Sequence, residues 1–197
     1  MESDARTLVS QLFHGINPRN TVAAIGGGTA WRAPKTAEDI IKYFKELGFN
    51  AIRLRVWVDP EGGWCAKEDV LVKAKRAQEL GMRIMIDFHY SDTWADPSNQ
   101  KTPAAWAALP IYELASAVET HTKETLQLLK DNKVDVEWVQ VGNETNSGML
   151  HPLGKISDNA DNFAILADKG YDAVKSVYPE AKVIIHRSEG HKANECR

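Results

Sequence analysis

Short apolar runs alternate with longer amphipathic segments along most of this chain, and this alternation constrains the fold more than any other feature. The amphipathic segments repeat their apolar residues at helical spacing, and two of them end at glycines, Gly48 and Gly81. In the first of them the apolar stripe is Ile40, Ile41, Phe44 and Leu47. The expected helices cover residues 36–47, 69–80, 111–131 and 159–177, and the expected strands cover residues 51–56, 82–88, 137–141 and 182–186. Such a repeat predicts parallel strands joined by right-handed helical crossovers.

Two fold types share this order of elements, the doubly wound sheet and the (β/α) barrel. The barrel is favoured because polar, ionisable and aromatic residues follow several successive strands, which is where a barrel presents its active site. A doubly wound fold usually has a spaced glycine loop for phosphate after its first strand, whereas Gly26, Gly27 and Gly28 lack that spacing and are interpreted as a turn. The expected fold class is therefore α/β, of the (β/α)8 TIM-barrel type.

The chain supplies only about half of such a barrel in this interpretation. It has 197 residues and four clear strands, whereas a whole barrel needs about 250 residues. The predicted parts are an irregular segment over 1–35, a partial barrel over 36–186 and an unpatterned tail over 187–197. Residues 22–25 are a candidate for one further strand. Because a half-barrel leaves strand edges and apolar surface uncovered, association with a missing half or self-association is expected.

Composition excludes several classes of function. A net charge of −3 and a pI near 6.1 give no sign of a nucleic-acid partner. No apolar run is long enough to span a membrane, and the polar N-terminus is unlike a signal peptide, so the chain is expected to be cytoplasmic or to lack its original start. The histidines lack metal-ligand spacing, so neither a metal nor a cofactor is expected. Cys65 and Cys196 are expected to be free thiols.

Two segments carry the groups that suggest chemistry, residues 87–97 and 139–144. Each begins as an apolar strand and ends in polar or aromatic residues. Glu144 closes the second strand, and a carboxyl group at such a position with aromatic rings nearby points to sugar chemistry. Arg53 and Arg55 share one face of their strand because they are two residues apart, and His89 shares a face with Asp87 for the same reason.

Three segments, residues 51–60, 89–97 and 142–150, resemble the signature segments of the endo-β-1,4-galactanases of glycoside hydrolase family 53. These are arabinogalactan-degrading enzymes within a barrel clan of retaining glycosidases. The resemblance runs from about residue 36 to residue 186. It implies an endo-acting hydrolase of β-1,4-galactosidic bonds that takes galactan as substrate and is secreted or held at the cell envelope because its substrate is a cell-wall polymer. The family's calcium site, where present, belongs to the half of the barrel that this chain does not match.

The resemblance also implies roles for individual residues. Glu144 matches the acid/base carboxyl, which protonates the leaving oxygen and then activates water. Asn143 matches the residue that hydrogen-bonds the sugar 2-hydroxyl, and Arg53 matches the residue that orients the nucleophilic carboxylate. The residues expected to contact sugar are Trp57, His89, Asp92, Trp94, Asn146 and His186.

Structural alternatives stand beside these roles. Asn143 suits a turn, and either arginine could form a structural ion pair with Asp87. His89 could be a satisfied core histidine, and the two tryptophans could pack in the core. Asp92 and Asp96 could hold their loop rigid instead of contacting sugar.

The chain also departs from the family pattern at positions that bear on catalysis and sugar binding. The family's nucleophile is a glutamate on a late strand, and no segment of this chain matches it. Glu189 and Glu195 follow the last strand in the wrong context, and His151 stands where the family often has tryptophan. Two alternatives therefore remain: a non-catalytic or vestigial galactan-binding fragment, and a related clan glycosidase acting on another β-1,4-glycan.

Overall fold

The computed structural model describes residues 7–8 and 37–188. The strands are β1 (Thr7–Leu8), β2 (Ala51–Val56), β3 (Arg83–Phe88), β4 (Val136–Val141) and β5 (Lys182–Ile184). The helices are α1 (Ala37–Glu46), α2 (Lys67–Glu79), α3 (Ile111–Asp131) and α4 (Ala160–Val177). Short 3-10 helices cover η2 (Glu61–Gly63), η3 (Ala104–Trp106) and η4 (Thr145–Ser147). The strand candidate over 22–25, the tail acids Glu189 and Glu195, and Cys196 lie outside the described residues.

The strands form one sheet in the order β1-β2-β3-β4-β5, and every neighbouring pair is parallel. Arg55 pairs with Asp87 in the ladder of β2 and β3, and Asp87 pairs with Gln140 in the ladder of β3 and β4. Over these strands the spatial order follows the chain order without reversal. A doubly wound sheet reverses its order, so this arrangement is that of a barrel wall.

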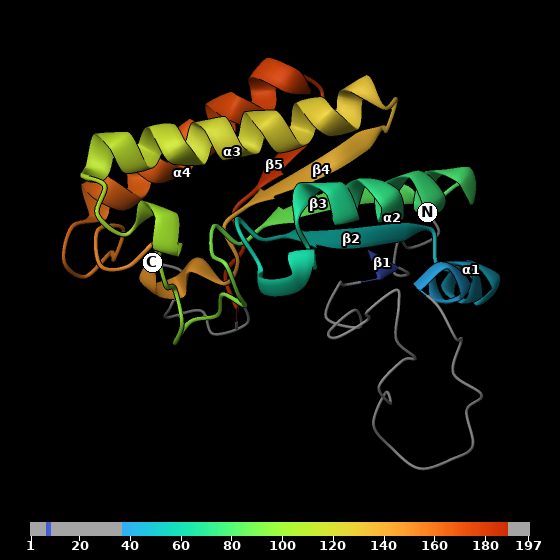
Figure 1. Ribbon diagram of the computed structural model, residues 1–197, viewed down its shortest axis with the longest axis horizontal. Coiled ribbons are helices and arrows are strands. Elements are labelled where there is room, and N and C mark those ends of the chain that lie inside the picture. The colour runs from blue at the N-terminus through green and yellow to red at the C-terminus, as the bar shows by residue number, and fades with distance from the viewer. Residues whose placement is uncertain (1–6, 9–36, 189–197) are drawn as a thin grey trace, which may run out of the picture.

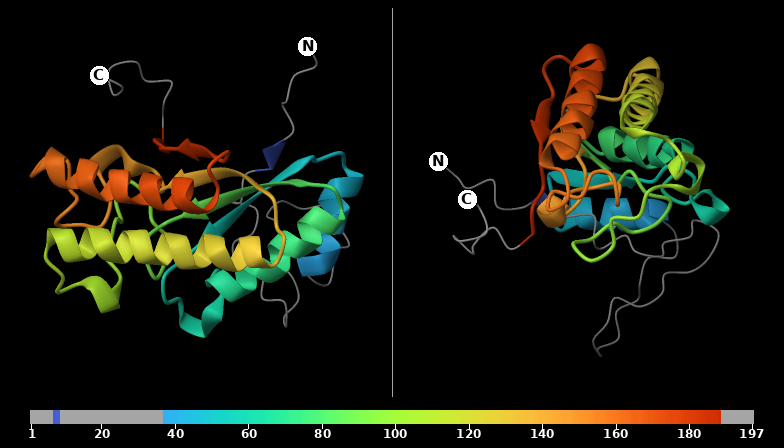
Figure 2. Two further views of the ribbon diagram at one scale, coloured as in Figure 1. Left: turned by 90° about the horizontal axis from the view of Figure 1, so that it is seen from above. Right: turned by 90° about the vertical axis from the view of Figure 1, so that its left-hand side faces the viewer.

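The helices follow one another in an arc along one side of the sheet, as Figures 1 and 2 show. Alternate strand residues such as Ile52, Ile86 and Val141 face this layer and are fully buried. The intervening positions carry polar side chains, including Arg53, Asp87 and Gln140, on the face turned away from the helices. The core between sheet and helices therefore fixes the strands, and the opposite face is left for polar groups.

Helix packing follows the sequence pattern closely. Helix α2 buries Val70, Ala74 and Ala77, and α3 spans the expected residues, 111–131. The residues expected to face inward from α3 are Leu114, Val118, Thr125 and either Leu128 or Leu129; the first three and Leu129 are buried, and Leu128 is half-buried. The side chain of Asn159 caps α4 by accepting hydrogen bonds from the N–H groups of Asp161 and Asn162.

Two expectations are wrong in detail. Leu47 does not join the buried stripe of α1, because the helix ends at Glu46 and the Leu47 side chain is 50% exposed. Strand β5 ends at Ile184 and does not reach His186. The carbonyl of His186 instead accepts hydrogen bonds from the Thr145 N–H at 2.8 Å and the Thr145 hydroxyl at 3.0 Å, which draws this residue away from the ladder and toward the end of β4.

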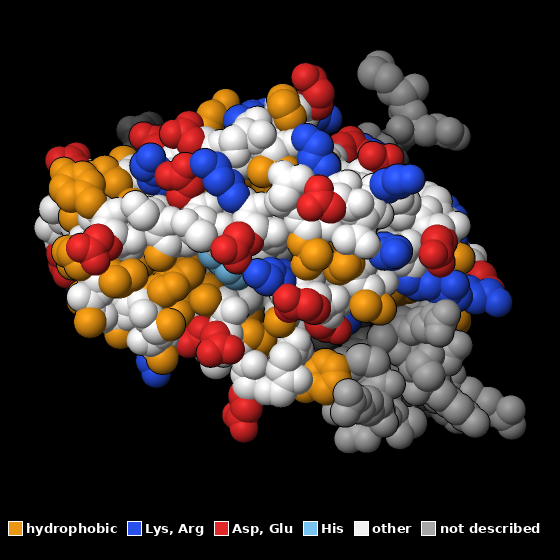
Figure 3. All heavy atoms as spheres, turned by 45° about the horizontal axis from the view of Figure 1, so that its top comes forward, with side chains coloured by type: hydrophobic (Ala, Val, Ile, Leu, Met, Phe, Trp, Pro, Cys, Tyr) orange, Lys and Arg blue, Asp and Glu red, His pale blue; other side chains and the backbone are white. Residues whose placement is uncertain are grey.

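Charged side chains of both signs are interspersed over the helical face in Figure 3. Glu119 of α3 pairs there with Lys123 and with Lys169 of α4. None of the described helices is long and apolar enough to cross a membrane.

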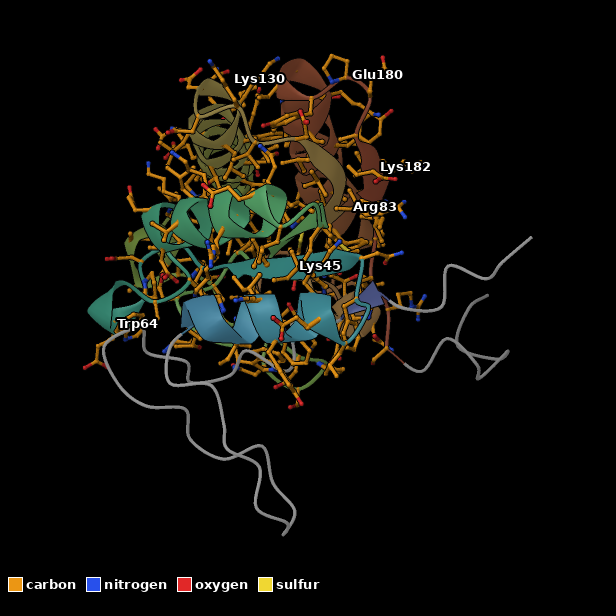
Figure 4. All side chains as sticks on the ribbon, turned by 90° about the vertical axis from the view of Figure 1, so that its right-hand side faces the viewer. Lys45, Trp64, Arg83, Lys130, Glu180 and Lys182 are labelled. Carbon is orange, nitrogen blue, oxygen red and sulfur yellow. The ribbon has the colours of Figure 1, made fainter. Side chains whose placement is uncertain are left out.

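A charged cluster lies where the strands begin, in the view of Figure 4. Arg83 donates two hydrogen bonds of 2.6 Å to the carboxylate of Glu137. The guanidinium of Arg83 also lies 4.3 Å from the ring centroid of Trp138, and the ammonium of Lys182 lies 5.8 Å from it. The catalytic candidates gather at the opposite end of the same strands.

Candidate active site

A buried polar network joins β2, β3 and the end of β4. The Nη2 atom of Arg53 donates to Asn143 Oδ1 at 2.7 Å and lies 2.9 Å from Asp87 Oδ2. All three side chains are buried, and Asp87 is only 1% exposed. Because a buried charge needs a partner, the Arg53–Asp87 pair is a structural requirement as well as a feature of the site.

Two further side chains complete the surroundings of Asn143. Gln140 Nε2 donates to Asp87 Oδ1 at 2.5 Å and lies 3.2 Å from Asn143 Oδ1. His186 Nδ1 lies 2.9 Å from the same oxygen. One N–H of the Asn143 amide is used by the carbonyl of Ala95, at 2.7 Å. The amide is thereby fixed in one orientation, with its oxygen toward Arg53 and its nitrogen toward the loop after β3.

The protonation state of His89 follows from its partners. Its Nδ1 accepts a hydrogen bond of 3.0 Å from the N–H of Ala95, so that nitrogen carries no proton. The proton must then sit on Nε2, which lies 3.1 Å from Asp87 Oδ2. Burial lowers the pKa of His89, and the charge of Arg55 adds to this effect, which outweighs the attraction of Asp87. His89 is therefore a neutral imidazole with both nitrogens bound by protein.

Asp87 is the anion at the centre of this network. Burial alone would raise its pKa, but the contacts with His89 and the charge of Arg53 outweigh burial and hold the pKa of Asp87 below its ordinary value. The pKa of His186 is lowered, first by burial and then by the charge of Arg53. At neutral pH Arg53 and Asp87 therefore form an ion pair, with the neutral imidazoles of His89 and His186 beside it.

Glu144 differs from these groups because its carboxyl is only partly buried and accepts no hydrogen bond from the described residues. Burial raises the pKa of Glu144, and the negative charge of Asp96 raises it further, while Arg53 opposes the shift. Its backbone is left-handed, with φ 49° and ψ 49°. A carboxyl group that stays protonated to a higher pH than usual can act as a general acid.

Arg55 lies between two indole rings. Its guanidinium carbon is 4.4 Å from the ring centroid of Trp57 and 4.5 Å from that of Trp94. Its Nη2 donates to the thiol of Cys65 at 3.4 Å, and Cys65 is a buried free cysteine. Both tryptophans expected to stack on sugar therefore present a ring to this cation, which also fixes their positions.

The expected aspartates hold loops together. Asp92 accepts hydrogen bonds from the N–H groups of Asp59 at 3.0 Å and Ala104 at 2.8 Å. Asp96 accepts from the N–H groups of Ser98 at 2.8 Å and Asn99 at 3.0 Å. These contacts show a structural use for both carboxylates and leave their contact with sugar a prediction.

Asn146 joins two segments that are distant in sequence. Its amide nitrogen donates to the carbonyl of Ser188 at 3.0 Å, and its oxygen accepts from the N–H of Ser188 at 2.8 Å. Together with His186, this pair connects the loop after β4 to the residues after β5.

Sequence reasoning missed Gln140 and Gln100. Gln140 could have been found, because it is a polar residue between two valines near the end of its strand. Gln100 lies in a loop that follows no period, so no local pattern marks it. No group of three His, Cys, Asp or Glu side chains that could hold a metal ion occurs in the described part of the chain.

Comparison with known proteins fits this geometry. A sequence profile of glycosyl hydrolase family 53 matches residues 21–197. The chain is 45% identical to a probable arabinogalactan endo-β-1,4-galactanase A of Aspergillus tubingensis over 145 residues, which is 73% of this chain and 41% of that protein.

Two solved structures that resemble this chain come from the same family. A GH53 catalytic domain of Ignisphaera aggregans has a TM-score of 0.73 and 40% identity, covering 82% of this chain and 46% of that one. A fungal β-1,4-galactanase has a TM-score of 0.75 and 36% identity, and the match covers 82% of this chain and 48% of that one. The chain thus spans less than half the length of these relatives. The chain belongs to glycosyl hydrolase family 53, and its fold is a partial (β/α)8 barrel.

Proposed function

We propose that this chain carries the acid/base half of the active site of a retaining, endo-acting hydrolase of β-1,4-galactosidic bonds in (arabino)galactan. The observation that carries the proposal is Glu144, a partly buried carboxyl with a raised pKa, next to an Asn143 that Arg53 and Gln140 fix in place. The family membership and the similarity to arabinogalactan endo-β-1,4-galactanases supply the substrate class.

In this proposal Glu144 is protonated when substrate binds. It donates its proton to the glycosidic oxygen as the nucleophilic carboxylate bonds to the anomeric carbon and the leaving sugar departs. The Glu144 carboxylate then removes a proton from the water that displaces the nucleophile from that carbon. Asn143 has one amide N–H beyond the one bound to Ala95, and this group is the donor for the sugar 2-hydroxyl. The remaining sugar contacts stay assigned to Trp57, His89, Asp92, Trp94, Asn146 and His186.

Retention requires a second carboxylate about 5–5.5 Å from the first. The two acids whose charges reach Glu144, Asp96 and Asp87, are both engaged in hydrogen bonds within the protein. The Nε of Arg53 is buried and has no partner among the described residues, so a donor is available for a carboxylate that arrives from outside residues 37–188. We therefore assign the nucleophile to a glutamate outside this part of the chain.

A galactan-binding fragment without turnover is the second candidate, and the lack of a matching nucleophile in the sequence favours it. A clan glycosidase for another β-1,4-glycan is the third. Since galactans are cell-wall polymers, we further propose that the protein acts outside the cell or at its envelope.

The test is reducing-sugar release from purified β-1,4-galactan by the whole chain, with Glu144→Gln beside it and Glu180→Gln as a control. Glu180 is an exposed acid in the turn between α4 and β5 (Figure 4). Release that is lost only in Glu144→Gln supports the hydrolase. No release, with galactan still retarding the protein in an affinity gel, supports the binding fragment. Equal release from β-1,4-glucan or β-1,4-mannan would contradict the proposed specificity.

A further inference from the structure

The side chain of Gln100 lies between the loop after β3 and the loop after β4. It is 3% exposed, and its amide nitrogen faces three backbone carbonyls. The distances are 2.8 Å to the carbonyl of Asn143, 3.3 Å to that of Glu144 and 3.0 Å to that of Asp96. Because carbonyl oxygens only accept hydrogen bonds, the NH2 end of the amide must be the end that occupies this position.

Two of these carbonyls flank the Cα atom of Glu144. The orientations of the peptides before and after a residue define its φ and ψ angles. In an extended chain, successive carbonyls point to opposite sides, so a single NH2 group could not reach both. In the left-handed conformation of Glu144 they lie on one side, where the amide nitrogen of Gln100 is within hydrogen-bond distance of both. Because this NH2 group has two N–H bonds and faces three carbonyls, one N–H is shared between two of them.

That conformation needs support, because a left-handed backbone is unfavourable for a residue other than glycine. The N–H of Asn146 donates to the carbonyl of Glu144 at 2.8 Å, and the N–H of Thr145 donates to the carbonyl of His186. Among residues 37–188, Gln100 is the one residue that hydrogen-bonds the carbonyls on both sides of Glu144. It also couples Glu144 to the turn at Asp96, whose charge reaches the Glu144 carboxyl.

Gln100 is itself held rigidly. Its backbone carbonyl accepts a hydrogen bond of 2.7 Å from the N–H of His151, and the next residue, Lys101, forms a parallel bridge with His151. The side-chain oxygen of Gln100 is buried and has no partner among the described residues. The hydroxyl of Thr102 donates to the carbonyl of His151 at 2.8 Å. The amide is therefore anchored at its backbone, so it can impose a conformation on Glu144.

We propose that Gln100 is a positioning residue for Glu144: its side-chain amide holds the left-handed backbone that determines where the Glu144 carboxyl points. The description as a positioning residue rests on the proposed acid/base role of Glu144. The contacts themselves do not depend on turnover, so they can be tested in the free protein.

The experiment is NMR on the whole chain labelled with 13C-glutamate, with the Glu144 signals assigned from Glu144→Gln. Gln100→Met keeps the length of the side chain and removes the donors. We expect the Glu144 Cα signal to move away from its left-handed position and the carboxyl pKa to fall toward the ordinary glutamate value as the residue becomes more hydrated.

Gln78→Met is the matched control. Gln78 also bridges two segments through its amide, with contacts to the carbonyl of Lys133 at 2.8 Å and the N–H of Asp135 at 2.6 Å, at the opposite end of the strands. Its replacement is expected to leave the Glu144 signals unchanged. Wild-type Glu144 signals in Gln100→Met would overturn the proposal.

Gln100→Glu provides a second, reversible test. When ionised, the new carboxylate faces carbonyl oxygens and repels them; when protonated, its O–H can donate one hydrogen bond. The Glu144 Cα signal should therefore be displaced at neutral pH and return toward its wild-type position in acid. An unchanged signal in both states, or a global loss of structure in both Gln100 variants, would overturn the assignment.

Discussion

Arg53 and Asn143 are 90 residues apart in sequence and are joined by a hydrogen bond of 2.7 Å in the buried centre of the site. The same Arg53 nitrogen lies 2.9 Å from Asp87. One guanidinium thus orients the amide beside Glu144 and neutralises the buried carboxylate, so a change at Arg53 affects both the fold and the site.

Replacing Arg53 by methionine should destabilise the protein strongly. Asp87 would remain as a buried charge without its cation, which typically costs about 3–5 kcal/mol in the free energy of unfolding. Urea denaturation measures this value. Lys67→Met, which breaks the exposed pair with Glu124, should cost at most about 1 kcal/mol.

The Asp87 charge, not lost packing, should account for the effect. The double variant Arg53→Met with Asp87→Asn should therefore be more stable than Arg53→Met alone. Equal stability of these two proteins would contradict this explanation.

Asp96→Asn should lower the pKa of Glu144. Removing a negative charge favours the ionised neighbour, and an asparagine oxygen can still accept the N–H groups of Ser98 and Asn99, so the turn should persist. The titration of the labelled Glu144 carboxyl measures the change. The exposed Asp158→Asn is the control, and an identical Glu144 titration in all three proteins would show that the Asp96 charge is not felt.

Acid should weaken the fold partly through His121. Burial lowers the pKa of His121 to about 4, and the charge of Lys67 adds to this effect, opposed by Glu124 and Asp92. Its ring lies against Phe88, Tyr90 and Trp106, and its Nε2 has no partner among the described residues.

The unfolded chain protonates His121 near pH 6.5, whereas the folded chain does so near pH 4. The contribution of the neutral His121 ring to the free energy of unfolding is therefore fully present above pH 6.5. It is lost as the pH falls from 6.5 to 4, by about 3 kcal/mol in all. Free energies of unfolding at several pH values should show a smaller acid loss for His121→Phe than for the wild type. If the free energies of unfolding of the two proteins fell by the same amount between pH 6.5 and pH 4, His121 would not be a cause of the acid loss.

Gly170→Ala should destabilise the contact between α4 and β4. A Cβ atom there would lie 2.5 Å from Val141 Cγ1 and 3.1 Å from the Tyr90 hydroxyl. The overpacking cost of about 1–3 kcal/mol should exceed the gain of about 1 kcal/mol in helix propensity. Thermal unfolding shows whether Gly170→Ala lowers or raises the stability. Adding Val141→Ala should restore part of the lost stability, and no restoration would mean that the contact with Val141 is not the cause.

The bounds of a helix or strand are predictable from the sequence where a local pattern of residues determines them. Helix α3 follows Pro110 and keeps its apolar spacing to its end, so its bounds were predicted correctly. Strand β5 was predicted too long, because the bonds between His186 and Thr145 are tertiary contacts that no local pattern encodes.

The candidate site divides in the same way. Glu144 and Asn143 could be placed from their position at the end of an apolar strand. The rings around Arg55 and the amide of Gln100 could not, since each joins loops that only the folded sheet brings together. Which of these groups contact sugar stays a prediction.

The cluster of Arg83, Glu137 and Trp138 lies at the beginning of the strands, and Val141, the last residue of β4, follows Glu137 by four residues, an axial separation of about 13 Å in an extended strand. At physiological ionic strength, charges exposed to water are largely screened beyond about 8 Å. The titration of Glu144 should thus be insensitive to charge reversal at Glu137. Labels, surface tethers and solubilising charges can be attached at that end of the sheet without altering the electrostatic environment of the catalytic candidates.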